Sequence, residues 1–273
     1  MTLEDHLGDI LRKARQSAGV SESVAALAAG LSIEAYARLE SSGVFDSLPN
    51  LAALASQVGL DGVRLERIAK RWRPEARDLA AWRELRQITT TRGGNAVHCY
   101  LVWDEVSREG ALFDTGWEAG PIFALIDDHE VNLRHLFLTH LHQDHVHAMQ
   151  PIRDRYPKLL LHTNSKSAPP QHRNRPNDFI SLGTLRIMNR DTPGHAEEGA
   201  TYVVGNWPDD APHVAIVGDT IFAGSIATGF QSTDLLKASI REQILALPED
   251  ALICPGHGPV TTVAEERTHN PFF

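Results

Sequence analysis

The stretch Thr139-His140-Leu141-His142-Gln143-Asp144-His145-Val146-His147 contains four histidines and one aspartate within nine residues. An apolar run over residues 133–138 precedes it and ends in Thr139, a pattern that predicts a buried strand. The histidines are therefore expected on the loop at the carboxyl end of that strand, where open α/β sheets place their ligands.

The spacing within this stretch predicts ligands for metal ions. His140 and His142 are separated by one residue, so both side chains can reach a single ion from one side of the chain. Asp144 and His145 follow at an offset that directs them toward a second position. Imidazole and carboxylate groups suit Zn²⁺ and also Fe or Mn, so the residue types alone do not decide the metal.

The overall composition predicts an ordinary globular protein with one large or two unequal domains. The 273 residues are 42% hydrophobic and 22% charged, and the net charge of −9 disfavours general binding to polyanions. No apolar run approaches the roughly 18 residues of a membrane span, and residues 1–20 lack the apolar core of a secretory signal. Two cysteines far apart in the chain, Cys99 and Cys254, predict reduced thiols. We therefore expect a cytoplasmic protein without a membrane partner.

The N-terminal segment predicts a small all-α domain over residues 1–72. Apolar residues recur at helical spacing from residue 7 to residue 17, and Ser21, Ser32 and Asn50 are placed to cap three further helices. The segment resembles the helix-turn-helix domain of the Cro/phage-repressor (XRE) type. The residues that carry this resemblance are 11–15, 19–21, 25–28, 31–32, 38–40, 48–49 and 51–55.

The charge of this helical segment disfavours binding to DNA. Residues 1–70 hold seven Lys or Arg against nine Asp or Glu, and the helix expected to enter a groove has Arg38 as its only basic residue. Phosphate contacts supply most of the affinity of such domains and require cationic side chains. We therefore expect the segment to dimerise, which would make the protein a homo-oligomer, or to pack on the larger domain and shape its pocket.

Three further units of strand and loop each deliver one candidate ligand. His195, Asp219 and His257 follow short predicted strands, and the adjacent Gly and Pro residues allow sharp turns close to a metal. A strand ending at residue 113 leads in the same way to Asp114. Six other histidines are expected to be ordinary surface residues: His6, His98, His129, His162, His172 and His213.

Residues 85–273, reached through a connector at residues 73–84, resemble a hydrolase of the metallo-β-lactamase fold. The motif His-x-His-x-Asp-His spans residues 140–145, and residues 218–225, 255–262 and 265–272 resemble the glyoxalase II-like branch. The resemblance implies an α/β fold, an αββα sandwich with a dinuclear metal site at one edge. It assigns one metal to His140, His142 and His195, the other metal to Asp144, His145 and His257, and a bridging role to Asp219.

The same resemblance implies a metal-dependent hydrolase with two divalent ions, Zn first and Fe or Mn as alternatives. Two ions about 3.5–4 Å apart share a hydroxide and lower its pKa to about 7. This bridging hydroxide would attack the carbonyl of a small-molecule ester, thioester or lactone, with Asp144 as the catalytic residue that orients it. The alternatives are a mononuclear-iron sulfur dioxygenase on the same fold and a transcription regulator that uses the metal domain as a sensor.

Two departures from the family pattern bear on the substrate. His147 stands where the family usually has Gly, which makes it a candidate catalytic residue, as a donor beside the metal or as a substrate contact, or else a simple substitution. After Gly224-Ser225 the chain continues with Ile226-Ala227 instead of Gly-Arg, which disfavours glutathione-type substrates. We expect the N-terminal helices to cover the pocket instead.

Overall fold

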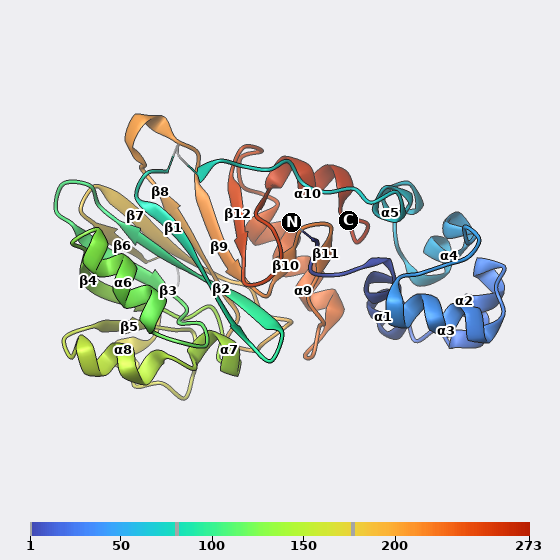
Figure 1. Cartoon of the computed structure of the whole chain (residues 1–273), viewed down its shortest axis with the longest axis horizontal. Coiled ribbons are helices and arrows are strands. Elements are labelled where there is room, and N and C mark those ends of the chain that lie inside the picture. Colours follow the sequence, from blue (N-terminus) through green and yellow to red (C-terminus); the bar gives the residue numbers. More distant parts are fainter. Residues whose placement is uncertain (1, 80–81, 176–177) are drawn as a thin grey trace.

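The computed structural model describes residues 2–79, 82–175 and 178–273. In these residues two β-sheets face each other, helices lie on their outer faces, and the first five helices gather at one end (Figure 1). The first sheet consists, in spatial order, of β1 (Leu85–Arg92), β2 (Asn95–Trp103), β3 (Glu109–Phe113), β4 (Asn132–Phe137) and β5 (Leu160–His162).

The second sheet has six strands. In spatial order they are β13 (Thr261–Thr262), β12 (Leu252–Pro255), β9 (Val214–Gly218), β8 (Ala200–Gly205), β7 (Leu185–Asp191) and β6 (Phe179–Leu182). A small hairpin is formed by β10 (Ile221–Phe222) and β11 (Ser225–Ile226). The pairs β3–β4, β4–β5 and β9–β12 are parallel, so the loops that follow these strands leave each sheet at one edge.

Side chains along the central strands alternate between two buried layers. Tyr202 and Val204 of β8 point between the sheets, whereas Val203 faces the outer helices. Tyr100 of β2 likewise points between the sheets and Leu101 points outward. Because both faces are buried, the sequences of these strands are nearly continuous apolar runs.

Helices cover the outer face of each sheet. The first sheet packs against α6 (Gly120–Asp128) and α8 (Met149–Arg155), and the short helix α7 (Gln143–Val146) follows β4. The second sheet packs against α9 (Thr233–Ser239), a π-helical turn (Ile240–Ile244) and α10 (Val263–His269). The layers are therefore α/β/β/α, as the resemblance predicted. No helix in the described ranges is long and apolar enough to cross a membrane.

The N-terminal segment is all-helical, as predicted. Its helices are α1 (Leu7–Ser17), α2 (Glu22–Ala29), α3 (Ile33–Ser42), α4 (Leu51–Val58) and α5 (Gly62–Ala69). The side chains of Ser21, Ser32 and Asn50 accept hydrogen bonds from backbone N–H groups three residues later, which confirms the three predicted caps. Each such cap stabilises its helix by about 1 kcal/mol.

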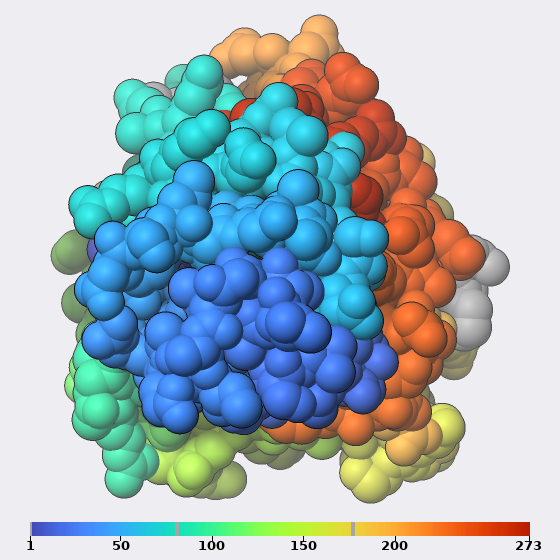
Figure 2. Space-filling model, turned by 90° about the vertical axis from the view of Figure 1, so that its right-hand side faces the viewer, coloured from blue at the N-terminus to red at the C-terminus, as the bar shows by residue number. Residues whose placement is uncertain are grey.

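The five N-terminal helices, called here the helical module, pack directly on the rest of the chain. They share one hydrophobic core with the outer face of the second sheet. Arg64 of α5 donates hydrogen bonds to the carbonyls of Asn270 and Phe273 at 3.1 and 2.6 Å, and Trp72 stacks on His269 with ring centroids 4.7 Å apart. In Figure 2 the module lies over this face of the molecule, with α1 against residues of the C-terminal third.

Some elements were not predicted from the sequence, among them β6, β8, α9 and α10. Residues 165–175 contain a 3-10 turn at Pro170–His172. The predicted domain boundary at residues 73–84 falls between α5 and β1, in a segment described only up to residue 79 and from residue 82.

Candidate metal centre

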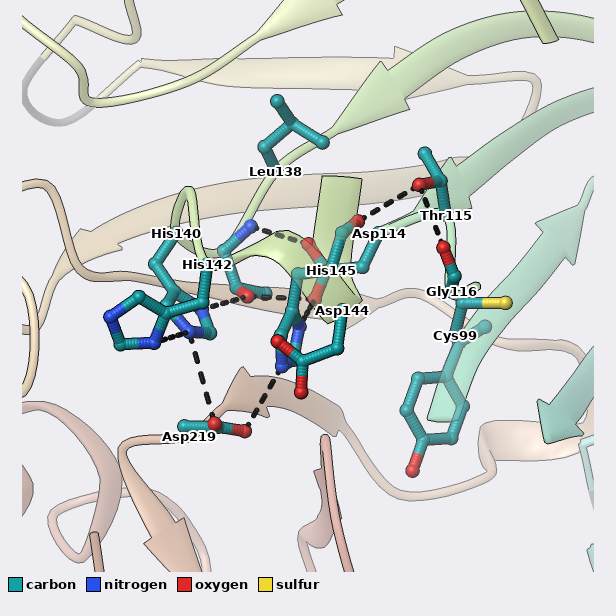
Figure 3. A network of polar contacts seen from close by, with 12 residues as sticks. Cys99, Asp114, Thr115, Gly116, Leu138, His140, His142, Asp144, His145 and Asp219 are labelled. Atoms are coloured by element: carbon teal, nitrogen blue, oxygen red, sulfur yellow. Dashed lines mark hydrogen bonds and ion pairs between the residues drawn. The ribbon is translucent and has the colours of Figure 1, made fainter. Parts of the chain in front are cut away.

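The seven predicted ligands come from four loops that meet at one edge of the sandwich. The loop after β4 carries His140, His142, Asp144 and His145, and the loops after β7, β9 and β12 carry His195, Asp219 and His257. Figure 3 shows His140 and His145 from the first sheet pointing toward Asp219 from the second. The structure brings together every residue that the sequence predicted as a ligand.

The first cluster consists of His140, His142, His195 and Asp219, whose possible ligand atoms all lie within 4.8 Å of one another. Nδ1 of His142 is 2.9 Å from Nε2 of His140 and 3.1 Å from Nε2 of His195. Oδ2 of Asp219 is 3.8 Å from Nε2 of both His140 and His195. Three imidazole nitrogens and one carboxylate oxygen at these separations can coordinate a single ion.

The second cluster consists of Asp144, His145 and His257. Nε2 of His257 is 3.3 Å from Oδ2 of Asp144 and 3.5 Å from Oδ2 of Asp219. Nε2 of His145 is 3.2 Å from Oδ1 of Asp219. The carboxylate of Asp219 therefore lies between the two clusters and can contact both.

Asp114, at the end of β3, fixes the orientation of His145. Its Oδ2 accepts a hydrogen bond from Nδ1 of His145 at 2.8 Å and from the hydroxyl of Thr139 at 2.7 Å. Its Oδ1 accepts the backbone N–H of Thr139 at 2.8 Å. Because the Thr139 hydroxyl donates to Asp114, its oxygen accepts from Nδ1 of His140 at 3.1 Å. Both imidazoles thus carry a proton on Nδ1 and turn Nε2 toward the clusters, where a metal ion would take the place of any second proton.

The other two Nε2 ligands are oriented by backbone carbonyls. Nδ1 of His195 donates to the carbonyl of Thr228 at 2.9 Å, and Nδ1 of His257 donates to the carbonyl of Ala96 at 2.7 Å. Hydrogen bonds of this kind set the tautomer of a metal-binding imidazole and hold its ring in place. Neither carbonyl was predicted, because a carbonyl acceptor has no signature in the side-chain sequence.

The prediction that His98, in β2, is a surface residue is wrong. Its ring is partly buried, its Nε2 donates to the carbonyl of Gly258 at 2.9 Å, and its backbone N–H donates to the carbonyl of Gly256 at 2.7 Å. Burial lowers the pKa of His98 to about 4, so the ring is neutral at physiological pH. His98 therefore holds the two glycines on either side of His257, a contact that spans about half of the chain and that no local pattern predicts.

The histidines His140 and His195 of the first cluster are in the protonation state that binds a cation. Burial lowers the pKa of His140 and His195, since a buried imidazole loses the hydration of its charged form. The neighbouring histidines lower both pKa values further, and Asp219 opposes them. The two rings are neutral at physiological pH, which is the form that binds metals.

The second cluster carries an excess of negative charge. Burial lowers the pKa of His145, but the carboxylates of Asp219 and Asp114 outweigh it and raise the pKa to about 10. Burial is likewise outweighed at His257, where Asp144 and Asp219 raise the pKa to about 11. Burial raises the pKa of Asp144, but the hydrogen bond from His257 and the charge of His145 lower it to about 2. The carboxylates here require positive charge, either as protons on the histidines or as a metal ion.

The unpaired atoms at this place fit a metal ion. Nε2 of His145 and Oδ1 of Asp219 are two of the three buried polar side-chain atoms that lack a hydrogen-bond partner in the described part of the chain. An unsatisfied buried polar atom costs about 1–3 kcal/mol, and a cation between these two would satisfy both. A Cβ on Gly256 would lie 2.4 Å from Oδ1 of Asp219 and 2.6 Å from Cε1 of His145, so only glycine leaves this space open.

His147 lies one helical turn after Asp144, on the outside of the site. Its Nε2 is 3.0 Å from Nη1 of Arg92, and its ring meets Trp117 edge to face at 5.5 Å. The guanidinium of Arg92 also lies over Trp117, 5.5 Å from the ring centroid. Because a guanidinium can only donate, His147 must accept at Nε2 and carry its proton on Nδ1.

The exposed aromatic ring of Phe230 lies beside the first cluster. Its side chain is 71% exposed, although its ring centroid is 6.0 Å from that of His142 and 5.4 Å from that of His195. It belongs to the loop that departs from the family pattern after Ser225. An exposed aromatic ring at this position offers an apolar surface to a substrate, a role that the sequence did not reveal.

The family model for the metallo-β-lactamase superfamily matches residues 92–257, and the chain therefore belongs to this superfamily. The superfamily binds divalent metals, in agreement with the two clusters. The match begins after α5, so the resemblance of the helical module to a helix-turn-helix domain remains a prediction.

Relatives with different activities are found on this fold. The chain is 29% identical over 201 residues to hydroxyacylglutathione hydrolase GloC of Haemophilus influenzae, covering 64% of the chain and 92% of the relative. It is 32% identical over 182 residues to the mitochondrial persulfide dioxygenase ETHE1 of Homo sapiens, covering 63% and 69%. The crystal structure of BLEG-1 B3 metallo-beta-lactamase superposes with a TM-score of 0.58 at 27% identity, covering 69% and 98%. The fold alone does not decide the reaction.

Proposed function

We propose that this protein is a dinuclear metal-dependent hydrolase that cleaves an ester, thioester or lactone. The first and second clusters would each hold one divalent ion, and Asp219 could contribute a ligand to both. The observation that supports this most strongly is the completeness of the second cluster. It has three ligands of its own, and the two unpartnered buried atoms of His145 and Asp219 face each other across 3.2 Å.

When bound, two such ions supply an activated water at neutral pH and polarise a substrate carbonyl. The chain positions the reactants around them. Asp144 is ionised at neutral pH, since its pKa is about 2, and can accept a hydrogen bond that orients the attacking water. Cys99 and Cys254 are fully buried and burial raises their pKa values, which disfavours a thiolate nucleophile.

His147 is proposed to contact the substrate or its leaving group. The hydrogen bond from Arg92 fixes the tautomer that presents Nδ1–H as a donor, and Trp117 holds the ring edge to face. A donor at this position would stabilise the developing charge on a leaving alkoxide or thiolate. The carboxylate of Asp144, one turn earlier in α7, lies on the metal side of the same helix.

Zinc is the proposed metal, with iron or manganese as alternatives. The five imidazoles and two carboxylates of the clusters are ligands that all three metals accept. The identity is therefore a property to be measured on the purified protein.

A second candidate function is a mononuclear-iron sulfur dioxygenase. The 32% identity to a persulfide dioxygenase supports it. Such an enzyme needs one metal, and it predicts that removing His257 from the second cluster leaves activity largely intact. The proposed hydrolase predicts the opposite, because His257 is a ligand of its second ion.

Both candidates are tested on one preparation of the full-length protein. Metal content is measured together with turnover of a panel of esters, thioesters and lactones, and with oxygen consumption in the presence of a persulfide. Hydrolysis without oxygen uptake supports the proposal. Oxygen uptake with persulfide and no hydrolysis of any panel member supports the second candidate instead.

A further inference from the structure

The helical module and the segment before α1 enclose a cavity of about 500 Å³. It is lined by residues 2–7, by the turn at residues 43–45, and by Ile68, Ala69, Arg71 and Arg73. The segment before α1 runs from the module back to the metal-bearing part of the chain (Figure 1), where Asp5 contacts Ser225.

Glu4 connects this cavity to the metal centre. A Cβ on Gly258 would lie 3.0 Å from the backbone nitrogen of Glu4 and 3.1 Å from its Cβ, so Glu4 packs directly on the residue after His257. The carboxylate of Glu4 interacts electrostatically with His257 and Asp219. Glu4 thus links the wall of the cavity to the loop that carries His257.

Asp5 anchors the segment in this position. Its Oδ2 accepts hydrogen bonds from the hydroxyl of Ser225 and from Nζ of Lys13, and Nζ of Lys13 also donates to the carbonyl of Ile226 at 3.0 Å. Asp5 and Lys13 are both largely buried, and their charges compensate each other. Among the charged groups that line the cavity, Asp5 is therefore not available to a ligand.

The wall of the cavity also carries uncompensated positive charge. Arg71 and Arg73 are exposed, and within the described residues no carboxylate lies within ion-pair distance of either guanidinium. Arg73 donates a hydrogen bond to the carbonyl of Trp72 at 3.0 Å. The wall further includes the apolar side chains of Leu3, Phe45 and Ile68.

We propose that this cavity binds the part of the substrate that extends from the scissile bond, and that Arg71 and Arg73 recognise an anionic group at its far end. The substrate class is then an ester or thioester with an apolar spacer and a terminal carboxylate or phosphate. The helical module is part of the active site in this arrangement. The inference rests on the proposed hydrolase function, which places the scissile bond at the metal centre.

A chain-length series tests the proposal on the full-length protein. The substrates are ω-(acetylthio)alkanoates of increasing length, each paired with its neutral primary amide. We expect the protein to prefer the carboxylate most strongly at one length. In the variant that combines Arg71→Gln and Arg73→Gln, the KM of that carboxylate should rise roughly ten- to a hundredfold, as expected for lost hydrogen bonds to a charged group, whereas the KM of the amide should not change.

Lys70→Gln provides the matched control. Lys70 is exposed, lies next to Arg71 in the chain and does not line the cavity, so Lys70→Gln removes one nearby positive charge, as each single arginine substitution does, without altering the wall. It should leave the preference for the carboxylate intact. No preference at any length, or a preference that survives in the double variant, would overturn the proposal.

A binding measurement separates this inference from the proposed function. An ω-(ethylthio)alkanoate of the preferred length has no scissile bond, and its affinity is measured by calorimetry. If no ester or thioester is hydrolysed, the series is run with these thioethers alone. Loss of binding in the double variant then supports the cavity even though the hydrolase function has failed. Hydrolysis with equal thioether binding in both proteins would overturn the cavity while leaving the hydrolase function in place.

Discussion

Replacing Asp114 by Asn should weaken metal binding most at the second cluster, whose ligand His145 it contacts directly. Asp114 accepts three hydrogen bonds, two from Thr139 and one from Nδ1 of His145, and it has a φ of +59°, a conformation that Asn tolerates. Asn keeps the shape of the side chain and offers one acceptor oxygen in place of two. At least one of the three donors must therefore lose its partner.

The size of the effect follows from which donor is lost. If the amide nitrogen faces Thr139, a buried backbone N–H is left unsatisfied, which costs about 1–3 kcal/mol of stability. If it faces His145, the ring is driven toward the tautomer that carries a proton on Nε2, the atom needed as a ligand. Loss of such an orienting carboxylate lowers metal affinity by about 10- to 100-fold.

The assay is a titration of Zn²⁺ into the metal-free protein in competition with a chelator. We expect one of the two sites to lose about 10- to 100-fold in affinity and the other site to change much less. Asp104→Asn is the matched control, because Asp104 is equally buried and accepts hydrogen bonds from Ser107 and Thr184 in a turn of its own. Equal weakening of both sites, or the same change with Asp104→Asn, would refute the role assigned to Asp114.

Three other substitutions give sharp outcomes. Burial raises the pKa of Glu266 from its ordinary 4.5 to about 7, so the folded protein holds this proton more tightly than the unfolded chain. The free energy of unfolding should therefore fall by about 3 kcal/mol as pH rises from about 4.5 to about 7, a slope that Glu266→Gln removes in denaturant titrations. Gly256→Ala should abolish binding of the second metal ion, seen in metal content, because its methyl group occupies the space between the ligands. Arg92→Gln should lower kcat about tenfold with metal content unchanged, because His147 loses the hydrogen bond that fixes its ring. Arg86→Gln is the control. It removes an equivalent arginine–tryptophan contact and should have no effect on kcat.

The metal ligands could be predicted because their positions have a local cause. Each of His140, His195, Asp219 and His257 follows a strand, and nearby Gly or Pro residues mark where the strand ends. The loops that carry these residues meet at one edge of the sandwich. Helix caps such as Ser32 were predictable for the same reason, because a cap is defined within four residues.

The contacts that orient these ligands depend on distant parts of the chain. His98 binds the carbonyl of Gly258 across the site, and Glu4 packs against the same glycine although more than 250 residues separate them. Such contacts arise only when the helical module and the two sheets are packed together. Strand β8 was missed because its six residues are all buried, so no alternation of polar and apolar side chains marks it.

The content of metal in the purified protein is the most direct test of the dinuclear site. Elemental analysis of the full-length protein should find two divalent ions per chain, and His257→Ala should retain one ion and lose hydrolysis. A single ion per chain in the unaltered protein, with content and turnover unchanged by His257→Ala, would contradict the dinuclear hydrolase.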